Sequence, residues 1–198
     1  MSKRYQFGET LDVNEDFFYV LSLITKSNTV FRTERDCIAN SYNDQLGEWD
    51  YISILTKEKY PQGTTLSTRC SFESYGAPLL VFSDDITRAE NGRDYYGLHF
   101  EIVAYEQGCN VWKITPDQHA PNDLPIRMDR IGFLEFPIAD GSIIDLSVQV
   151  KDGAIYVRIN GREFSVADPD LPQTFHVGLT ACEGVNRFYD FQINSAKE

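Results

Sequence analysis

Two segments carry polar side chains that could share one surface. In the segment TLSTRCSF, strand alternation puts Arg69 on the side opposite a set of apolar residues, and in YYGLHFEIVAY it puts Tyr95, His99 and Glu101 on one side. The apolar sets opposite them are Leu66, Cys70 and Phe72, and Tyr96, Leu98, Phe100 and Ile102. If both strands belong to one sheet, the four polar residues share a solvent-facing surface, with Trp112 at its rim.

This mixture of side chains suits a saccharide. The C–H face of a pyranose ring packs on an aromatic side chain, while its hydroxyls exchange hydrogen bonds with charged groups. The alternative is structural: the polar face is only solvated, and Trp112 belongs to the core, as most tryptophans do. Strand alternation alone does not separate the two interpretations.

Metal and cofactor sites are less well supported. The four cysteines (Cys37, Cys70, Cys109 and Cys182) lack the spacing of zinc or redox motifs, and there are only three histidines. No nucleotide-binding glycine motif, nucleophile elbow or zinc-protease motif is present. We therefore infer no cofactor and no metal site. The acidic segments at Asp84-Asp85 and at Asp168 and Asp170 could bind a structural calcium ion, but such residues more often stabilise turns.

The elements that must position these residues are strands. Period-two alternation recurs from residue 64 to the end of the chain, and no segment has a helical apolar period. We predict strands over residues 64–74, 95–105, 110–114, 130–136, 143–150, 154–159, 163–166, 174–181 and 188–193. Asp152-Gly153 and Asn160-Gly161 predict two tight hairpins that make residues 143–166 a three-stranded meander. Between Gly108 and Arg130, three prolines predict a long surface loop.

Composition limits the classes of function. The chain has 198 residues with a formal net charge of −12 and no basic cluster, so nucleic acid and membranes are poor candidate partners. We expect one domain over 1–198, since sandwiches of this size are common.

No apolar segment typical of a signal peptide follows the N-terminus, so we expect a cytoplasmic protein with reduced thiols. The sequence does not determine the oligomeric state.

The order of the C-terminal motifs supports a family resemblance. The succession of an alternating strand, a turn, IYVRING, a proline-bearing loop, FHVGL and FYDFQI over residues 141–193 resembles the C-terminal half of concanavalin A-like lectin and glucanase domains, including laminin G-like members. The resemblance implies an all-β, antiparallel jelly-roll sandwich of two sheets. It also implies carbohydrate binding on the concave sheet, for which Arg69, Tyr95, His99, Glu101 and Trp112 are the candidate ligand-binding residues.

A second resemblance raises the question of catalysis. The segment EIVAYE resembles the E-x-D-x-x-E strand of laminarinase-type glycoside hydrolases, which implies Glu101 as the nucleophile and Glu106 as the acid/base. A retaining glycosidase needs two carboxyls roughly 5 to 5.5 Å apart. Val103 replaces the middle carboxylate, and two such glutamates arise by chance in an acidic chain.

The sandwich also resembles 3-keto-disaccharide hydrolase domains. Saccharide binding is the leading hypothesis, glycoside hydrolysis the alternative, and a structural or protein-interaction domain a third class.

Overall fold

The protein is built from β-strands. The computed structural model describes residues 2–8, 13–20, 30–88, 94–117 and 126–195, and within these ranges it has strands and turns and no helix. No described helix is therefore long or apolar enough to cross a bilayer. The prediction of an all-β fold is confirmed.

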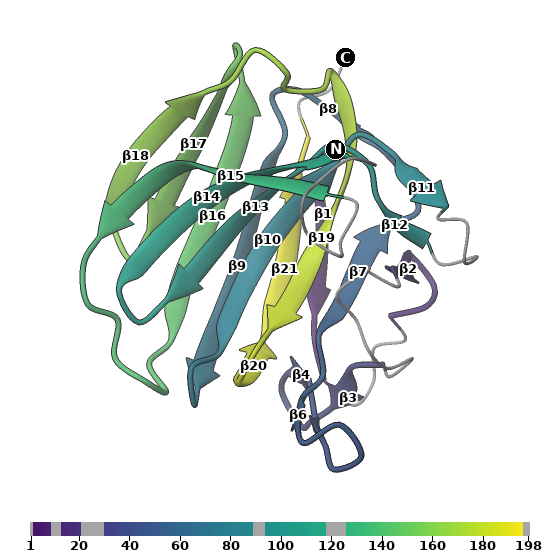
Figure 1. The fold of residues 1–198 in the computed structure, drawn as a ribbon, viewed down its shortest axis with the longest axis vertical. Coiled ribbons are helices and arrows are strands. Elements are labelled where there is room, and N and C mark those ends of the chain that lie inside the picture. The colour runs from purple at the N-terminus through teal and green to yellow at the C-terminus, as the bar shows by residue number, and fades with distance from the viewer. Residues whose placement is uncertain (1, 9–12, 21–29, 89–93, 118–125, 196–198) are drawn as a thin grey trace.

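Two large antiparallel sheets form a sandwich (Figure 1). The nine-stranded sheet contains β18 (Arg162–Ala167), β17 (Ala154–Ile159), β16 (Ile144–Lys151), β9 (Thr65–Glu73), β20 (Val185–Phe188), β4 (Ile38–Ala39), β3 (Arg32–Thr33), β21 (Asp190–Asn194) and β1 (Ser2–Gln6). The eight-stranded sheet contains β15 (Ile126–Glu135), β14 (Gly108–Pro116), β13 (His99–Tyr105), β10 (Ala77–Ser83), β19 (Thr174–Cys182), β7 (Ile52–Thr56), β2 (Phe17–Val20) and β8 (Tyr60–Pro61).

Two short hairpins lie beside these sheets. The first joins β5 (Tyr42–Asn43) to β6 (Glu48–Trp49), and the second joins β11 (Ile86–Arg88) to β12 (Asp94–Tyr96). In Figure 1 they occupy different parts of the molecule, with β6 at the lower end near β4 and β3, and β11 and β12 at the right-hand edge.

The space between the sheets holds one apolar core. Alternate residues of each strand point into it, for example Leu66 and Phe72 from β9 and Phe100 and Ile102 from β13. Phe82 and Phe100 stack there with ring centroids 5.0 Å apart. The alternation predicted for these strands is confirmed, so the opposite side chains of each strand face outward.

The C-terminal strands follow the predicted order. β16, β17 and β18 form a meander, and its two turns place Asp152, Gly153, Asn160 and Gly161 at φ values of 51°, 73°, 47° and 77°. Positive φ at two successive residues is the requirement of a type I′ hairpin, which Asn and Asp followed by Gly meet with least strain. The two predicted hairpins are confirmed.

The predicted loop between Gly108 and Arg130 is wrong over 108–116 and 126–130, which are strands, and its middle part, 118–125, lies outside the described residues. β14 runs through to Pro116 and β15 begins at Ile126, and the two strands pair along their whole length with one bulge at Val111/Trp112. Pro116 is tolerated because it is the last residue of its strand. The predicted strand over 95–105 is also divided, since Gly97 and Leu98 separate β12 from β13.

A buried ion pair ties β14 to the loop that leads from one sheet to the other. Lys113 Nζ lies 2.9 Å from Asp168 Oδ1 and also bonds Asp170, and the Lys113 and Asp168 side chains are only 14% and 8% exposed. Burial alone would lower the pKa of Lys113, but the hydrogen bonds to Asp170 and Asp168 outweigh it and raise that pKa.

We expect Lys113→Met to lower the free energy of unfolding by about 1 to 3 kcal/mol, because it leaves the Asp168 carboxylate buried without its cation. Urea denaturation measures the change. Lys151→Met is the matched control, because Lys151 and Asp152 form an ion pair with side chains 54% and 74% exposed; its effect should stay within about 0.5 kcal/mol. Equal effects for the two variants would contradict this account.

Candidate functional site

The candidate site lies on the outer face of the eight-stranded sheet. β13 directs His99 and Glu101 outward, and Trp112 of β14 is the direct cross-strand partner of Glu101. Part of this face is covered, because Val20, Leu55, Leu79 and Val81 form a second apolar cluster to which Ile86 of the β11–β12 hairpin adds. The rest of the face is hollowed.

Two adjoining clefts form this hollow, which we call the groove. The first measures about 390 Å³ and the second about 540 Å³, and they share Met128, Cys182 and Glu183. Described residues that line the first include Glu101, Glu106, Asn110 and Trp112; those that line the second include Tyr42, Trp49, Asp50 and Tyr51. The groove therefore contains both tryptophans of the chain, one in each half.

Glu101 forms part of the floor of the groove. Its side chain is nearly buried, and Tyr51 Oη donates a hydrogen bond to Glu101 Oε1 at 3.3 Å. His99 Nε2 lies 3.6 Å from the same oxygen, and His99 Nδ1 lies 2.9 Å from the Gly97 carbonyl oxygen. A buried carboxylate is tolerated when such partners replace water. The arrangement holds one carboxylate in a fixed position between the two halves of the groove.

A buried asparagine joins the two walls of the second cleft. Asn40 Nδ2 donates to the backbone oxygens of Asp50 at 3.0 Å, Gly184 at 2.9 Å and Glu183 at 3.3 Å, while Asn40 Oδ1 accepts from the Asn186 backbone N–H. Asp50 directly follows Trp49, so this one side chain fixes both the tryptophan-bearing hairpin and the turn between β19 and β20.

Glu183 has a strained backbone at the junction of the two clefts. Its φ is 54°, a left-handed conformation that non-glycine residues seldom adopt, and Asn186 Nδ2 donates to its carbonyl oxygen at 2.9 Å in addition to Asn40. Such strain persists only where the surroundings enforce it, and it concentrates at functional sites. The turn therefore makes Glu183 a lining residue of both clefts.

Asn110 contributes an unused hydrogen-bond acceptor. It is 7% exposed and lines the first cleft, and within the described part of the chain its side-chain oxygen has no hydrogen-bond partner. Buried acceptors are nearly always satisfied, so an orphan one beside a cleft indicates a donor that arrives with a ligand.

The structure brings together only some of the predicted site residues. His99, Glu101 and Trp112 share the outer face of the eight-stranded sheet, but the prediction that Arg69 shares it is wrong, because β9 belongs to the nine-stranded sheet. Arg69 faces out on the opposite side of the sandwich and pairs with Asp190 at 3.1 Å. Tyr95 is on β12, outside the two large sheets, and its side chain lies outside the described part of the structure.

The two glutamates of the hydrolase hypothesis line the same cleft but differ in their setting. Glu101 is in the middle of β13, which pairs with β14 without a bulge up to Tyr105, whereas Glu106 falls in the exposed turn that follows. At about 3.3 Å per residue, strand geometry separates their Cα atoms by roughly 15 Å. The carboxyls approach retaining distance only if both side chains lean toward each other.

The outer face of the nine-stranded sheet is also hollowed, by about 450 Å³ around Tyr156 and about 400 Å³ around Arg69. Four of its charged groups form two ion pairs, Arg69 with Asp190 and Arg158 with Glu163. Its buried carboxylate, Asp190, already accepts hydrogen bonds from the Arg69 backbone N–H at 2.8 Å and from Arg69 Nε at 3.1 Å. Tyr156 is the one exposed aromatic side chain among its described lining residues. We therefore place the candidate site in the groove.

Asp85, Asp168 and Asp170, from the acidic segments considered for calcium, have hydrogen-bond partners within the protein. Lys113 Nζ bonds the carboxylates of Asp168 and Asp170, and Asp85 Oδ1 accepts from the Ile86 backbone N–H at 2.8 Å. Across the described ranges, no three His, Cys, Asp or Glu side chains converge as a metal site would require. The Asp85 contact is the turn chemistry that the sequence also allowed, and so is the hydrogen bond from the Asp170 backbone N–H to Asp168 Oδ1 at 2.9 Å, whereas the Lys113 contacts are an ion pair with β14.

The pKa of the Cys182 thiol responds to the negative charge of the groove. Burial raises the pKa of its thiol, and the nearby carboxylates of Glu101 and Glu183 raise it further. We expect slow alkylation of Cys182 at pH 8, and faster alkylation in Glu101→Gln or Glu183→Gln because each removes a negative charge that disfavours the thiolate. Peptide mapping by mass spectrometry measures the rates. Unchanged rates in both variants would refute the proximity of these groups.

Comparison with known proteins identifies the fold. No family model and no curated protein matches the sequence. Among solved structures, β-agarase A from Zobellia galactanivorans matches at TM-score 0.63 with 9% identity, covering 90% of this chain and 82% of that one. The κ-carrageenase from Pseudoalteromonas carrageenovora, in complex with a κ-carrageenan oligotetrasaccharide, matches at 0.60 with 8% identity, covering 96% and 92%.

Carbohydrate-binding module CBM66 from Bacillus subtilis matches at TM-score 0.52 with 10% identity, covering 75% of this chain and 86% of that one. At these identities the similarity shows the fold alone. The prediction of a concanavalin A-like, two-sheet sandwich is confirmed.

Proposed function

We propose that this protein binds a saccharide chain in the groove on the outer face of its eight-stranded sheet. The observation that carries the proposal is the position of the nearly buried Glu101 carboxylate in a groove with a tryptophan in each half. Aromatic rings pack on the C–H faces of sugars, and a fixed carboxylate accepts hydrogen bonds from their hydroxyls. The orphan oxygen of Asn110 adds a second acceptor.

The solved structures that share the fold support this proposal by analogy. An agarase, a carrageenase and a carbohydrate-binding module all belong to that set. Fold alone does not determine function, so the argument rests on the groove and its side chains.

A screen of oligosaccharides on an array, followed by calorimetry on the hits, tests the proposal. We expect at least one saccharide to bind in the micromolar to millimolar range, with affinity lost on changes within the groove and kept on changes to the nine-stranded sheet. Absence of binding to every glycan, or binding that survives all groove variants, would overturn the proposal. If binding survives all groove variants, the hollow around Tyr156 becomes the candidate site.

Glycoside hydrolysis is the second candidate function, favoured by one observation: Glu101, Glu106 and Glu183 all line the first cleft. A release assay on each glycan that binds tests it, through the appearance of new reducing ends. Binding without release supports a binding protein. Release that is lost in Glu101→Gln supports an enzyme.

A further inference from the structure

The groove is acidic along its length. Glu101, Glu106 and Glu183 line the first cleft, and Glu48, Asp50 and again Glu183 line the second. Among the described residues that line either cleft there is no Lys, Arg or His. Glu106 and Glu183 are exposed, so their charges face whatever enters, while Asp50 is buried and accepts a hydrogen bond from Ser41 at 3.2 Å.

The basic side chains beside Trp112 and Glu101 are not part of the described lining of the groove. Arg130 lies beside Trp112, with its guanidinium carbon 6.0 Å from that ring and 5.2 Å from the Phe133 ring, so it packs on aromatic surface at the rim. His99 is 5% exposed, and its Nε2 lies 3.6 Å from Glu101 Oε1. A ligand in the groove therefore meets carboxylates before it meets a cation.

One uncharged polar group also favours a ligand that supplies hydrogen-bond donors. Asn110 Oδ1 is a buried acceptor that needs a hydrogen-bond donor, and carboxylates are acceptors only. A ligand that fits must therefore supply donors. Sugar hydroxyls do so, whereas the carboxylates and sulfates of acidic sugars add acceptors and negative charge.

We propose that the groove selects uncharged saccharide chains and rejects chains that carry carboxylate or sulfate groups. The proposal rests on the saccharide-binding function proposed above and names its ligand class. The selection is by exclusion: like charges repel strongly where water is partly displaced, so the groove discriminates against the acidic chain as well as favouring the neutral one.

Matched pairs of oligosaccharides test the proposal on the full-length protein. Mannohexaose and the hexamer of β-1,4-mannuronate have the same linkage and differ in the oxidation of C6. Cellohexaose and its C6-oxidised form, and a κ-carrageenan hexamer and its desulfated form, give two further pairs. For each backbone that binds, we expect the acidic member to bind at least tenfold more weakly at low salt, which corresponds to about 1.4 kcal/mol, and the difference to shrink in high salt.

Charge-neutralising variants test the cause. Glu183→Gln and Glu106→Gln should each reduce the ratio of neutral to acidic affinity several-fold. Glu163→Gln is the matched control, because it removes the same charge from the nine-stranded sheet, and it should leave that ratio unchanged.

The outcomes separate the two proposals. An acidic chain that binds as tightly as its neutral counterpart, or a ratio that falls equally in Glu163→Gln, overturns charge selection and leaves saccharide binding standing. Absence of binding to every array glycan and to both members of every pair overturns the saccharide proposal itself, and charge selection with it.

Discussion

Replacing Trp112 with Ala is expected to weaken saccharide binding by about 10- to 100-fold, since an aromatic side chain that packs on a ligand commonly contributes about 2 kcal/mol. Trp112 is the cross-strand neighbour of Glu101, so a sugar ring on the indole places its hydroxyls within reach of that carboxylate. Calorimetry with the best-binding oligosaccharide measures the effect.

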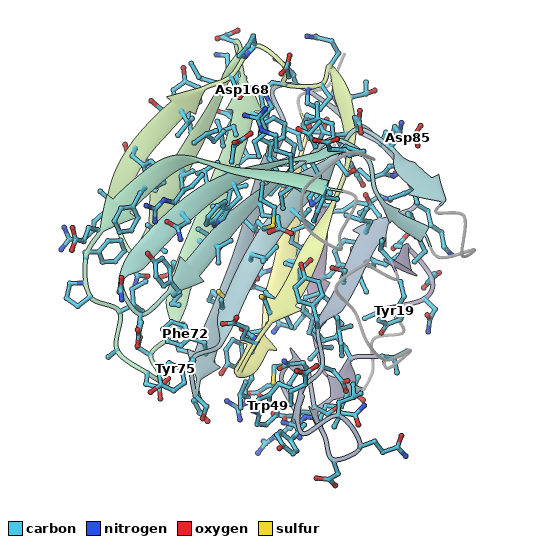
Figure 2. The ribbon with its side chains drawn as sticks, in the orientation of Figure 1. Tyr19, Trp49, Phe72, Tyr75, Asp85 and Asp168 are labelled. Carbon is cyan, nitrogen blue, oxygen red and sulfur yellow. The ribbon has the colours of Figure 1, made fainter. Side chains whose placement is uncertain are left out.

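Trp49→Ala extends this test to the second half of the groove. Figure 2 shows Trp49 at the same end of the sandwich as Tyr75, an exposed residue that lines the first cleft. We expect Trp49→Ala to weaken the binding of long oligosaccharides and to leave that of disaccharides nearly unchanged, because short ligands occupy one cleft.

Tyr156→Ala is the matched control for both tryptophans. Tyr156 is 46% exposed on the nine-stranded sheet, so its loss removes an aromatic surface without touching the groove. Affinity that falls in Tyr156→Ala but survives Trp112→Ala would move the site to the other side of the molecule.

The fold could be predicted from the sequence because its signals are local. The alternation of IIDLSVQV and AIYVRI sets one buried and one exposed face, and the Asp-Gly and Asn-Gly pairs have the positive φ values that the two hairpins require. The loop predicted between Gly108 and Arg130 was wrong over 108–116 because a proline suggests a loop when its position within a strand is unknown. Pro116 at the end of β14 breaks no hydrogen bond of the sheet interior.

The site was predicted only in part, for a physical reason. Alternation tells which side of a strand faces the core, but it does not tell to which sheet the strand belongs. Arg69 and Glu101 both face outward, yet the sandwich puts them on opposite sides.

The residues that the prediction missed lie in short or irregular segments. Trp49 belongs to a two-residue strand, Tyr51 follows it, and Glu183 is in a turn without the Asn-Gly or Asp-Gly signature. Their position depends on the long-range hydrogen bonds of Asn40, which no local pattern reveals. The only sequence signal was the clustering of Trp49, Asp50 and Tyr51 in an otherwise polar stretch.

Replacing Glu101 with Gln has the other large expected effect, and it separates the two candidate functions. For a binding protein we expect affinity to fall by about 10- to 100-fold, because hydrogen bonds to a charged acceptor contribute about 1.5 to 3 kcal/mol. For a hydrolase we expect the rate of release to fall by about a thousandfold or more while the substrate still binds, because a catalytic carboxylate acts mainly on the transition state.

Two further variants make the result specific. Tyr51→Phe removes the hydroxyl that donates to Glu101 Oε1 at 3.3 Å and keeps the ring, so it should weaken binding less than Glu101→Gln does. Glu106→Gln abolishes release only if the exposed turn after β13 supplies the second carboxylate of a catalytic pair. If Glu101→Gln changes neither affinity nor release while the protein stays folded, the floor of the groove is not the site. Glu101 is then a buried carboxylate that serves only the packing of β13 against Tyr51.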